Sequence, residues 1–227
     1  MAWERINKVG LELEGAWGEV LFEEPFIEEV SLPVPVGYVR GKHHWGEIVS
    51  PPLTPPEAIK WLDKHYPTLI PPPEGQGTDQ ERSAGFHIHL SFHSNLDYAT
   101  LMSRAFYNQW LGDMEEWGKK AKAGPLFDSR LEGKNRFARR IFRPRAQVGQ
   151  KLKDSGVNAS RRTLLNYPHA LHTTIESRLF PMFPDKAMGL SALRATMDCF
   201  HNYLEQHKPA VSPQKLRMLV GDARRAA

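Results

Sequence analysis

Three pairs of polar side chains, each spaced two residues apart within an apolar run, constrain the fold of this chain most. The pairs are Glu12 and Glu14, His87 and His89, and Glu176 and Arg178. Successive side chains of a β-strand point to opposite faces, so each pair would project from one face while its apolar neighbours cover the other. Ionised groups on a partly enclosed face lose hydration and need opposite charges or a metal. The pattern therefore predicts three strands that share a site for a metal and an anion.

The composition is that of a globular protein. The 227 residues, 41% hydrophobic and 25% charged, suffice for one domain with a sizeable core. No apolar run approaches the ~20 residues that span a bilayer, and the first residues lack the build of a secretory signal. We therefore expect a cytoplasmic protein without a membrane partner. The single cysteine, Cys199, excludes an intramolecular disulfide and is predicted to be a buried structural thiol.

Positive charge is concentrated in one segment. Residues 119–162 contain fourteen lysines and arginines against three acidic residues, although the net charge of the whole chain is only +4. Such a segment is a solvated loop, or it binds polyphosphate, an acidic substrate or nucleic acid. We predict one domain over residues 1–227, with a basic insertion at about 123–162 that can be mobile.

Hydrophobic periodicity predicts early strands, then interspersed helices and late strands. The expected strands are 6–15, 19–31, 34–49, 85–93, 163–171 and 173–183, and the expected helices are 57–66, 97–122 and 185–206. Asp97 is the predicted N-cap of the second helix. This order predicts the α+β class with a mainly antiparallel sheet.

Hard oxygen donors dominate the candidate site once Glu47, in a further strand-like run, is added. Carboxylates suit Mg²⁺, or Mn²⁺, which keep several waters and take their remaining contacts from substrate phosphates. A structural zinc site would use cysteine and a catalytic one mostly histidine. Each pair alone is more often a solvated or cross-strand-paired feature. Their joint occurrence in apolar runs favours a site for two or three divalent ions.

Five short motifs occur in a fixed order along the chain. They are Gly10-Leu-Glu-Leu-Glu14, Glu47-Ile-Val-Ser-Pro51, Gly85-Phe-His-Ile-His-Leu90, Arg161-Arg-Thr-Leu-Leu-Asn166 and Ile175-Glu-Ser-Arg178. In order and approximate spacing they resemble the amidoligase family, a branch of the glutamine synthetase-like carboxylate–amine ligases that includes glutamate–cysteine ligases. The resemblance covers about residues 6–183. Each motif is weak alone, and the ordered set is fairly specific. Ser177 departs from the family, which more often has an apolar residue there.

This resemblance implies a fold and an activity. The fold would be a curved, mainly antiparallel sheet with helices packed on its outer face, as in the catalytic domain of glutamine synthetase. The sheet would cradle ATP and two or three Mg²⁺ ions. The implied enzyme is an ATP- and Mg²⁺-dependent ligase that joins a small-molecule or peptide carboxylate to an amine through an acyl phosphate. The acceptor acid, the amine, the base that deprotonates it and the oligomeric state are not implied.

The resemblance also implies metal ligands. Glu14 and Glu47 resemble ligands of the metal nearer the acceptor carboxylate. Glu12, His87 and Glu176 resemble ligands of the metal that bridges the ATP phosphates. Both sets consist of the donor types expected from the residues alone.

The remaining roles concern the nucleotide and the transferred phosphoryl group. The nucleotide-side candidates implied by the family are His89, Ser91, Arg161, Arg162 and Asn166. Arg178 would face the γ-phosphoryl group or the substrate carboxylate, where a guanidinium fork binds better than an ammonium. Arg178, Glu14 and Glu47 are the predicted catalytic residues.

Two other functions fit parts of the sequence. A metal-dependent hydrolase could use Zn²⁺ on His87 and His89 to activate water. A non-catalytic module could bind nucleic acid or another anion through residues 119–162. The ligase is favoured because the five motifs occur as an ordered set, and nucleic acid is a less favoured partner that is not excluded.

Overall fold

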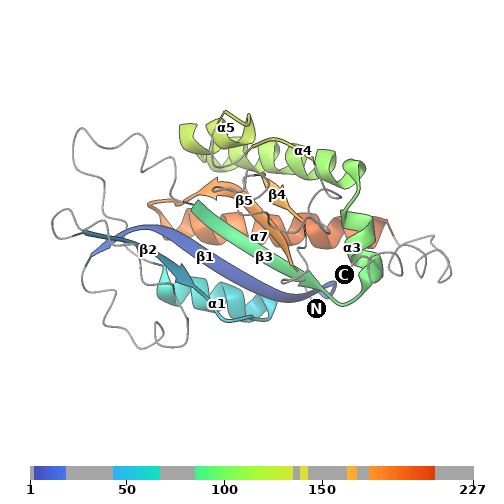
Figure 1. Cartoon of the computed structure of the whole chain (residues 1–227), viewed down its shortest axis with the longest axis horizontal. Helices are drawn as coiled ribbons and strands as arrows, with labels where there is room; N and C mark the ends of the chain where they lie inside the picture. Colours follow the sequence, from blue (N-terminus) through green and yellow to red (C-terminus); the bar gives the residue numbers. More distant parts are fainter. Residues whose placement is uncertain are drawn as a thin grey trace, which may run out of the picture.

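In the part of the chain that the structure describes, five strands form one open antiparallel sheet in the order β2-β1-β3-β5-β4 (Figure 1). The computed structural model describes residues 3–18, 43–66, 85–134, 139–142, 163–167 and 174–207. The strands are β1 (Ile6–Gly18), β2 (His43–Val49), β3 (Gly85–Phe92), β4 (Leu165–Asn166) and β5 (Ile175–Pro181). The helices are α1 (Pro55–His65), α3 (Asn95–Leu101), α4 (Arg104–Ala121), α5 (Pro125–Leu131) and α7 (Lys186–Gln206). The predicted α+β class with a mainly antiparallel sheet is confirmed.

Alternation along the central strands divides the sheet into two faces. In β1, Val9, Leu11 and Leu13 are fully buried, whereas Glu12 and Glu14, at the alternate positions, are half-buried. In β3 the buried apolar set is Phe86, Ile88, Leu90 and Phe92. One face of the sheet therefore belongs to the core, and the polar pairs project from the other.

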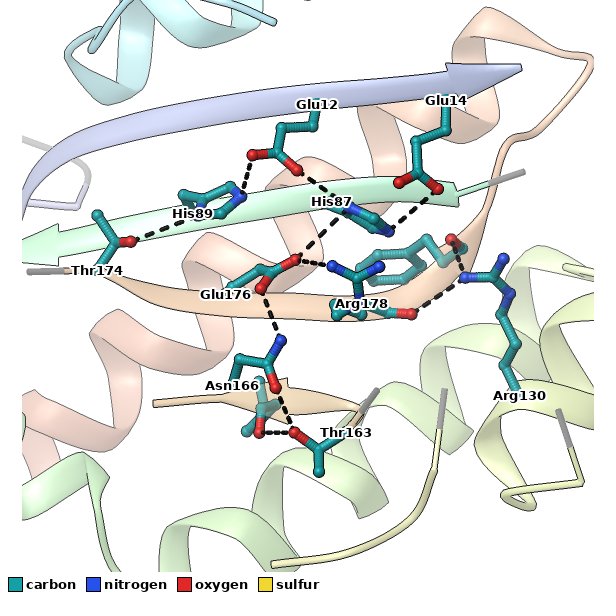
Figure 2. A network of polar contacts seen from close by, with 12 residues as sticks. Glu12, Glu14, His87, His89, Arg130, Thr163, Asn166, Thr174, Glu176 and Arg178 are labelled. Carbon is teal, nitrogen blue, oxygen red and sulfur yellow. Dashed lines mark hydrogen bonds and ion pairs between the residues drawn. The ribbon is translucent and has the colours of Figure 1, made fainter. Parts of the chain in front are cut away.

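Helix α7 covers the core face. Its apolar residues Leu193, Met197 and Phe200 are completely buried, and it runs behind β3 and β5 in Figures 1 and 2. The Phe200 ring stacks on Phe92 of β3 at a centroid distance of 5.9 Å. The side chain of Asp185 accepts a hydrogen bond from the N–H of Ala187 and caps the helix. The predicted helix at 185–206 is confirmed to within one residue.

The helix predicted over 97–122 is wrong as a single element. Ser94 caps α3, and Ser103 caps α4 by accepting a hydrogen bond from the N–H of Phe106 at 3.1 Å. A serine hydroxyl that binds a free backbone N–H favours a new helix start over continuation of the preceding one. Asp97, the predicted cap, lies in the first turn of α3, where its buried carboxylate pairs with Arg5.

The predicted basic insertion begins with an ordered helix. Pro125 opens α5, and the Phe127 ring packs on Gly118 of α4 so closely that a Cβ there would lie 2.2 Å from Phe127 Cε1. Arg139 then forms an isolated parallel bridge with Thr163, next to β4. Residues 135–138 and 143–162 of the insertion, the predicted strand at 19–31 and part of the one at 34–49 lie outside the described residues. No helix in the described ranges is long and apolar enough to cross a membrane.

Candidate functional site

The three polar pairs meet on one face of the adjacent strands β1, β3 and β5 (Figure 2). Glu12 lies directly opposite His87, and His89 lies opposite Glu176. Gly10 is the β1 neighbour of His89, so the imidazole meets no side chain there and can contact Glu12 on the diagonal. The structure thus brings together all six residues of the three pairs.

The Glu12 carboxylate lies between the two histidines. Its Oε2 is 3.1 Å from His87 Nδ1, and its Oε1 is 2.9 Å from His89 Nε2. Burial opposes ionisation of Glu12, but the contacts with the two imidazoles prevail and lower the pKa of its carboxyl. Burial likewise opposes protonation of His89, yet Glu12 outweighs it and raises the pKa of the imidazole. The contact between Glu12 and His89 is an ion pair whenever the imidazole is protonated.

Glu176 is held by three side chains. Its Oε1 is 2.6 Å from Arg178 Nη1 and 3.5 Å from His87 Nδ1, and its Oε2 accepts a hydrogen bond of 2.7 Å from the Asn166 amide. Thr163 donates to Asn166 Oδ1, which orients the amide nitrogen toward Glu176. Burial opposes ionisation of Glu176, but the charge of Arg178 prevails and lowers the pKa of the carboxyl.

His87 occupies the centre of the cluster. It is 1% exposed, and its Nε2 lies 3.6 Å from Glu14 Oε2. The ring fits because position 85 is a glycine: a Cβ there would lie 2.5 Å from His87 Nε2 and 3.0 Å from the Glu14 carboxylate. The motif glycine Gly85 therefore leaves the space that His87 and Glu14 fill.

The donor set fits a hard divalent cation. Glu12, His89 and Glu176 each offer one ligand atom, and these atoms lie within 4.8 Å of one another. His89 Nε2 is buried and makes no well-directed hydrogen bond among the described residues, despite its short distance to Glu12. Two carboxylates and one imidazole suit Mg²⁺ or Mn²⁺. The family resemblance implies His87, not His89, as the histidine ligand of this metal. Because His87 also lies against Glu12 and Glu176, the choice between the two histidines stays a prediction.

The other predicted site residues are less completely placed. Glu47 pairs with Glu14 in the β1–β2 register, which puts the two positions side by side, and only its backbone is described. Ser91 Oγ accepts a hydrogen bond of 3.0 Å from the N–H of Lys8, so its hydroxyl is engaged by β1. Arg161 and Arg162 lie outside the described residues; the next residue, Thr163, belongs to the Asn166 end of the network.

Three residues of the network, Thr163, Thr174 and Arg130, were missed in the sequence. Thr174, directly before β5, has its Oγ1 3.4 Å from His89 Nδ1. Arg130 of α5 is 1% exposed and donates to two carbonyl oxygens of β5. A signal for Arg130 existed, because Phe127, Arg130 and Leu131 share one helix face, but the surrounding basic residues obscured it.

Comparisons with known proteins do not indicate a function for this chain. No family model matches this chain, no curated protein matches it, and no solved structure matches its fold. The resemblance to amidoligases therefore rests on the five ordered motifs.

Proposed function

We propose that this protein is an ATP- and Mg²⁺-dependent carboxylate–amine ligase of the amidoligase type, with a sheet like that of the glutamine synthetase catalytic domain. One observation carries the proposal: carboxylates, imidazoles and a guanidinium from β1, β3 and β5 converge on the sheet face opposite the core. The reaction would activate a small-molecule or peptide carboxylate as an acyl phosphate, which an amine then attacks.

The metal ligands divide between two positions. Glu12 and Glu176, with His87 or His89, would hold the ion on the nucleotide side, and Glu14 with Glu47 would hold the ion on the acceptor side. Bound Mg²⁺ would supply charge neutralisation to the phosphates and the acceptor carboxylate. The protein contributes the fixed positions of the ligands, which is what phosphoryl transfer mainly requires.

Arg178 is the residue best placed to bind the transferred phosphoryl group. Its Nη1 is engaged by Glu176, whereas its buried Nε–H has no hydrogen-bond partner among the described residues. An unpaired buried donor on a guanidinium costs free energy that an anionic oxygen would recover. Burial opposes the charge of Arg178, but Glu176 prevails and raises the pKa of the guanidinium, so the cation persists when substrate arrives.

Calorimetric titration with a non-hydrolysable ATP analogue tests the proposal. We expect wild-type protein to bind the analogue only with Mg²⁺ or Mn²⁺, at two or more ions per chain. Glu14→Gln should remove one bound ion and lower the affinity for the analogue. The matched control Glu116→Gln, on the exposed surface of α4, should bind the ions and the analogue as the wild type does. Failure of wild-type protein to bind the analogue at millimolar Mg²⁺ would rule the ligase out.

Metal analysis of the same samples separates the ligase from the alternatives. Tightly bound zinc without nucleotide affinity would favour a hydrolase based on His87 and His89. Binding of DNA or RNA that weakens steeply with salt would favour a module based on residues 119–162. The ligase predicts neither result.

A further inference from the structure

Strand β5 contains a bulge next to Arg178. Ile88 of β3 pairs with Ser177, but Phe86 pairs with Phe180, so both Arg178 and Leu179 lie opposite His87. Phe180 is thereby returned to the core face, where it is fully buried and stacks on Phe127 of α5. Bulges of this kind re-aim the side chains of a strand. Here the bulge determines the direction in which the Arg178 side chain projects from the sheet.

The backbone at the bulge lies at the end of the β4 ladder. β4 pairs with β5 only at Glu176 and Ser177, and the N–H of Arg178 then donates to the carbonyl of Leu164. Beyond that point the Arg130 side chain supplies hydrogen bonds of the kind that a neighbouring strand would make to β5. Its Nη1 donates to the carbonyl oxygens of Arg178, at 3.1 Å, and of Phe180, at 3.0 Å (Figure 2).

We propose that Arg130 is a positioning residue, which holds the β5 bulge and thereby fixes the direction in which the Arg178 guanidinium enters the site. One nitrogen spans both residues that flank Leu179, so the bulge cannot shift along β5 without breaking a buried hydrogen bond. Each such loss leaves a buried carbonyl unsatisfied. The positioning follows from the backbone contacts alone, and its consequence for ligation rests on the proposed function.

The buried guanidinium is compatible with this role. Burial lowers the pKa of Arg130 to about 10, with the charge of Arg178 acting in the same direction and that of Glu14 against it. Arg130 is therefore still protonated at neutral pH and keeps its donors. A lysine would retain the charge but would present a compact ammonium on a flexible stem in place of the planar fork.

Three variants test the proposal. Arg130→Met removes the donors and keeps an apolar stem, and Arg130→Lys keeps the charge. Leu131→Ala, also buried on α5, is the matched control for loss of packing. Each variant is examined by ¹H–¹⁵N NMR at a temperature where it is folded, through the Arg178 Nε–Hε resonance, assigned with Arg178→Lys, and the backbone amides of residues 178–180.

We expect Arg130→Met to shift the Arg178 Nε–Hε resonance and the bulge amides, Arg130→Lys to shift them less, and Leu131→Ala to leave them near their wild-type values. Affinity for the ATP analogue with Mg²⁺ should fall about tenfold in Arg130→Met and stay unchanged in Leu131→Ala. An unshifted Arg178 resonance in Arg130→Met, or in Arg130→Lys if the methionine variant does not fold, would overturn the positioning role. The NMR result stands even if wild-type protein binds no nucleotide, so the two proposals can fail separately.

Discussion

The two faces of β1, β3 and β5 are built from alternate residues of the same strands, yet they differ in how completely their groups are satisfied. On the core face Leu11, Ile88 and Ile175 are fully buried against the helices. On the opposite face Glu12, His89 and Glu176 are crowded together although each remains partly accessible. Apart from the Ser177 hydroxyl, the core face of these strands is apolar, whereas the site face retains donors that fit a ligand.

This difference separates stability from function. Burying charged groups on the site face costs hydration that the ion pairs only partly recover, so folding alone does not explain the cluster. In the part of the chain that the structure describes, the Nε–H of Arg178 has no hydrogen-bond partner and the Nε2 of His89 has none that is well directed, so the recovery is incomplete at these two atoms. Substitutions on the two faces should therefore change different measurements.

The largest effect is expected from Arg178→Met. Loss of the guanidinium should lower the rate of ATP-dependent ligation by about 10²–10³-fold, as for removal of one preorganised transition-state donor. Arg178→Lys should restore little, because an ammonium cannot reproduce the planar fork. The measurement is ADP formation in the presence of candidate acids and amines, with circular dichroism to verify folding. Full activity in Arg178→Met would remove the main functional distinction between the faces.

The opposite result is expected from Leu11→Ala on the core face. Truncating this fully buried side chain should reduce the free energy of unfolding by about 2–5 kcal/mol, measured in urea. Affinity for Mg²⁺ and for the ATP analogue should remain within about twofold when the protein is folded, since additivity holds for residues without shared partners. A large loss of metal affinity here would show that the faces are coupled.

Strand alternation was enough to predict which residues share the site face, because the period of two is a local property. The contacts within that face were not predictable, because they depend on register between strands that are distant in sequence. Gly10 opposite His89 creates the diagonal contact with Glu12, and the bulge after Ser177 re-aims β5; neither is encoded in the spacing of the pairs. Arg130 was hidden for another reason, since a basic run usually indicates solvated side chains.

Substitutions of the two histidines should differ less in their effects than substitutions on the two faces of the sheet do. If His89 is the metal ligand, His89→Asn should weaken Mn²⁺ binding about 10–100-fold, and His87→Asn should have the smaller effect. The family resemblance predicts the reverse order. Mn²⁺ titration followed by electron paramagnetic resonance distinguishes the two, with thermal unfolding of both variants to allow for the burial of His87. Equal small effects would exclude both imidazoles as ligands.

The pH dependence of stability sharpens the comparison further. Glu12 has a lowered pKa, so its contribution is present above the ordinary carboxyl pKa of about 4.3 and is lost as pH falls toward its folded value. His89 has a raised pKa, so its contribution is complete below about 6.5 and is lost as pH rises through its folded value. Metal-free protein should therefore lose stability in urea as pH rises above about 6.5, and His89→Gln should flatten that decline. Leu11→Ala should lower the whole curve without changing its shape.

The smallest effect is expected at Ser177, the polar residue that interrupts the core side of β5. It is 1% exposed, and its Oγ has no hydrogen-bond partner among the described residues. Because an unsatisfied buried hydroxyl costs free energy, Ser177→Ala should leave the free energy of unfolding unchanged or raise it by about 1 kcal/mol. The matched control is Thr196→Ala on α7, whose buried hydroxyl donates to the carbonyl of Ala192 at 2.9 Å and whose loss should destabilise the protein. Ser177→Ala could instead destabilise the fold and lower the affinity for the ATP analogue. That result would mean that the hydroxyl has a partner on the site side and that the division between the two faces is incomplete at this residue.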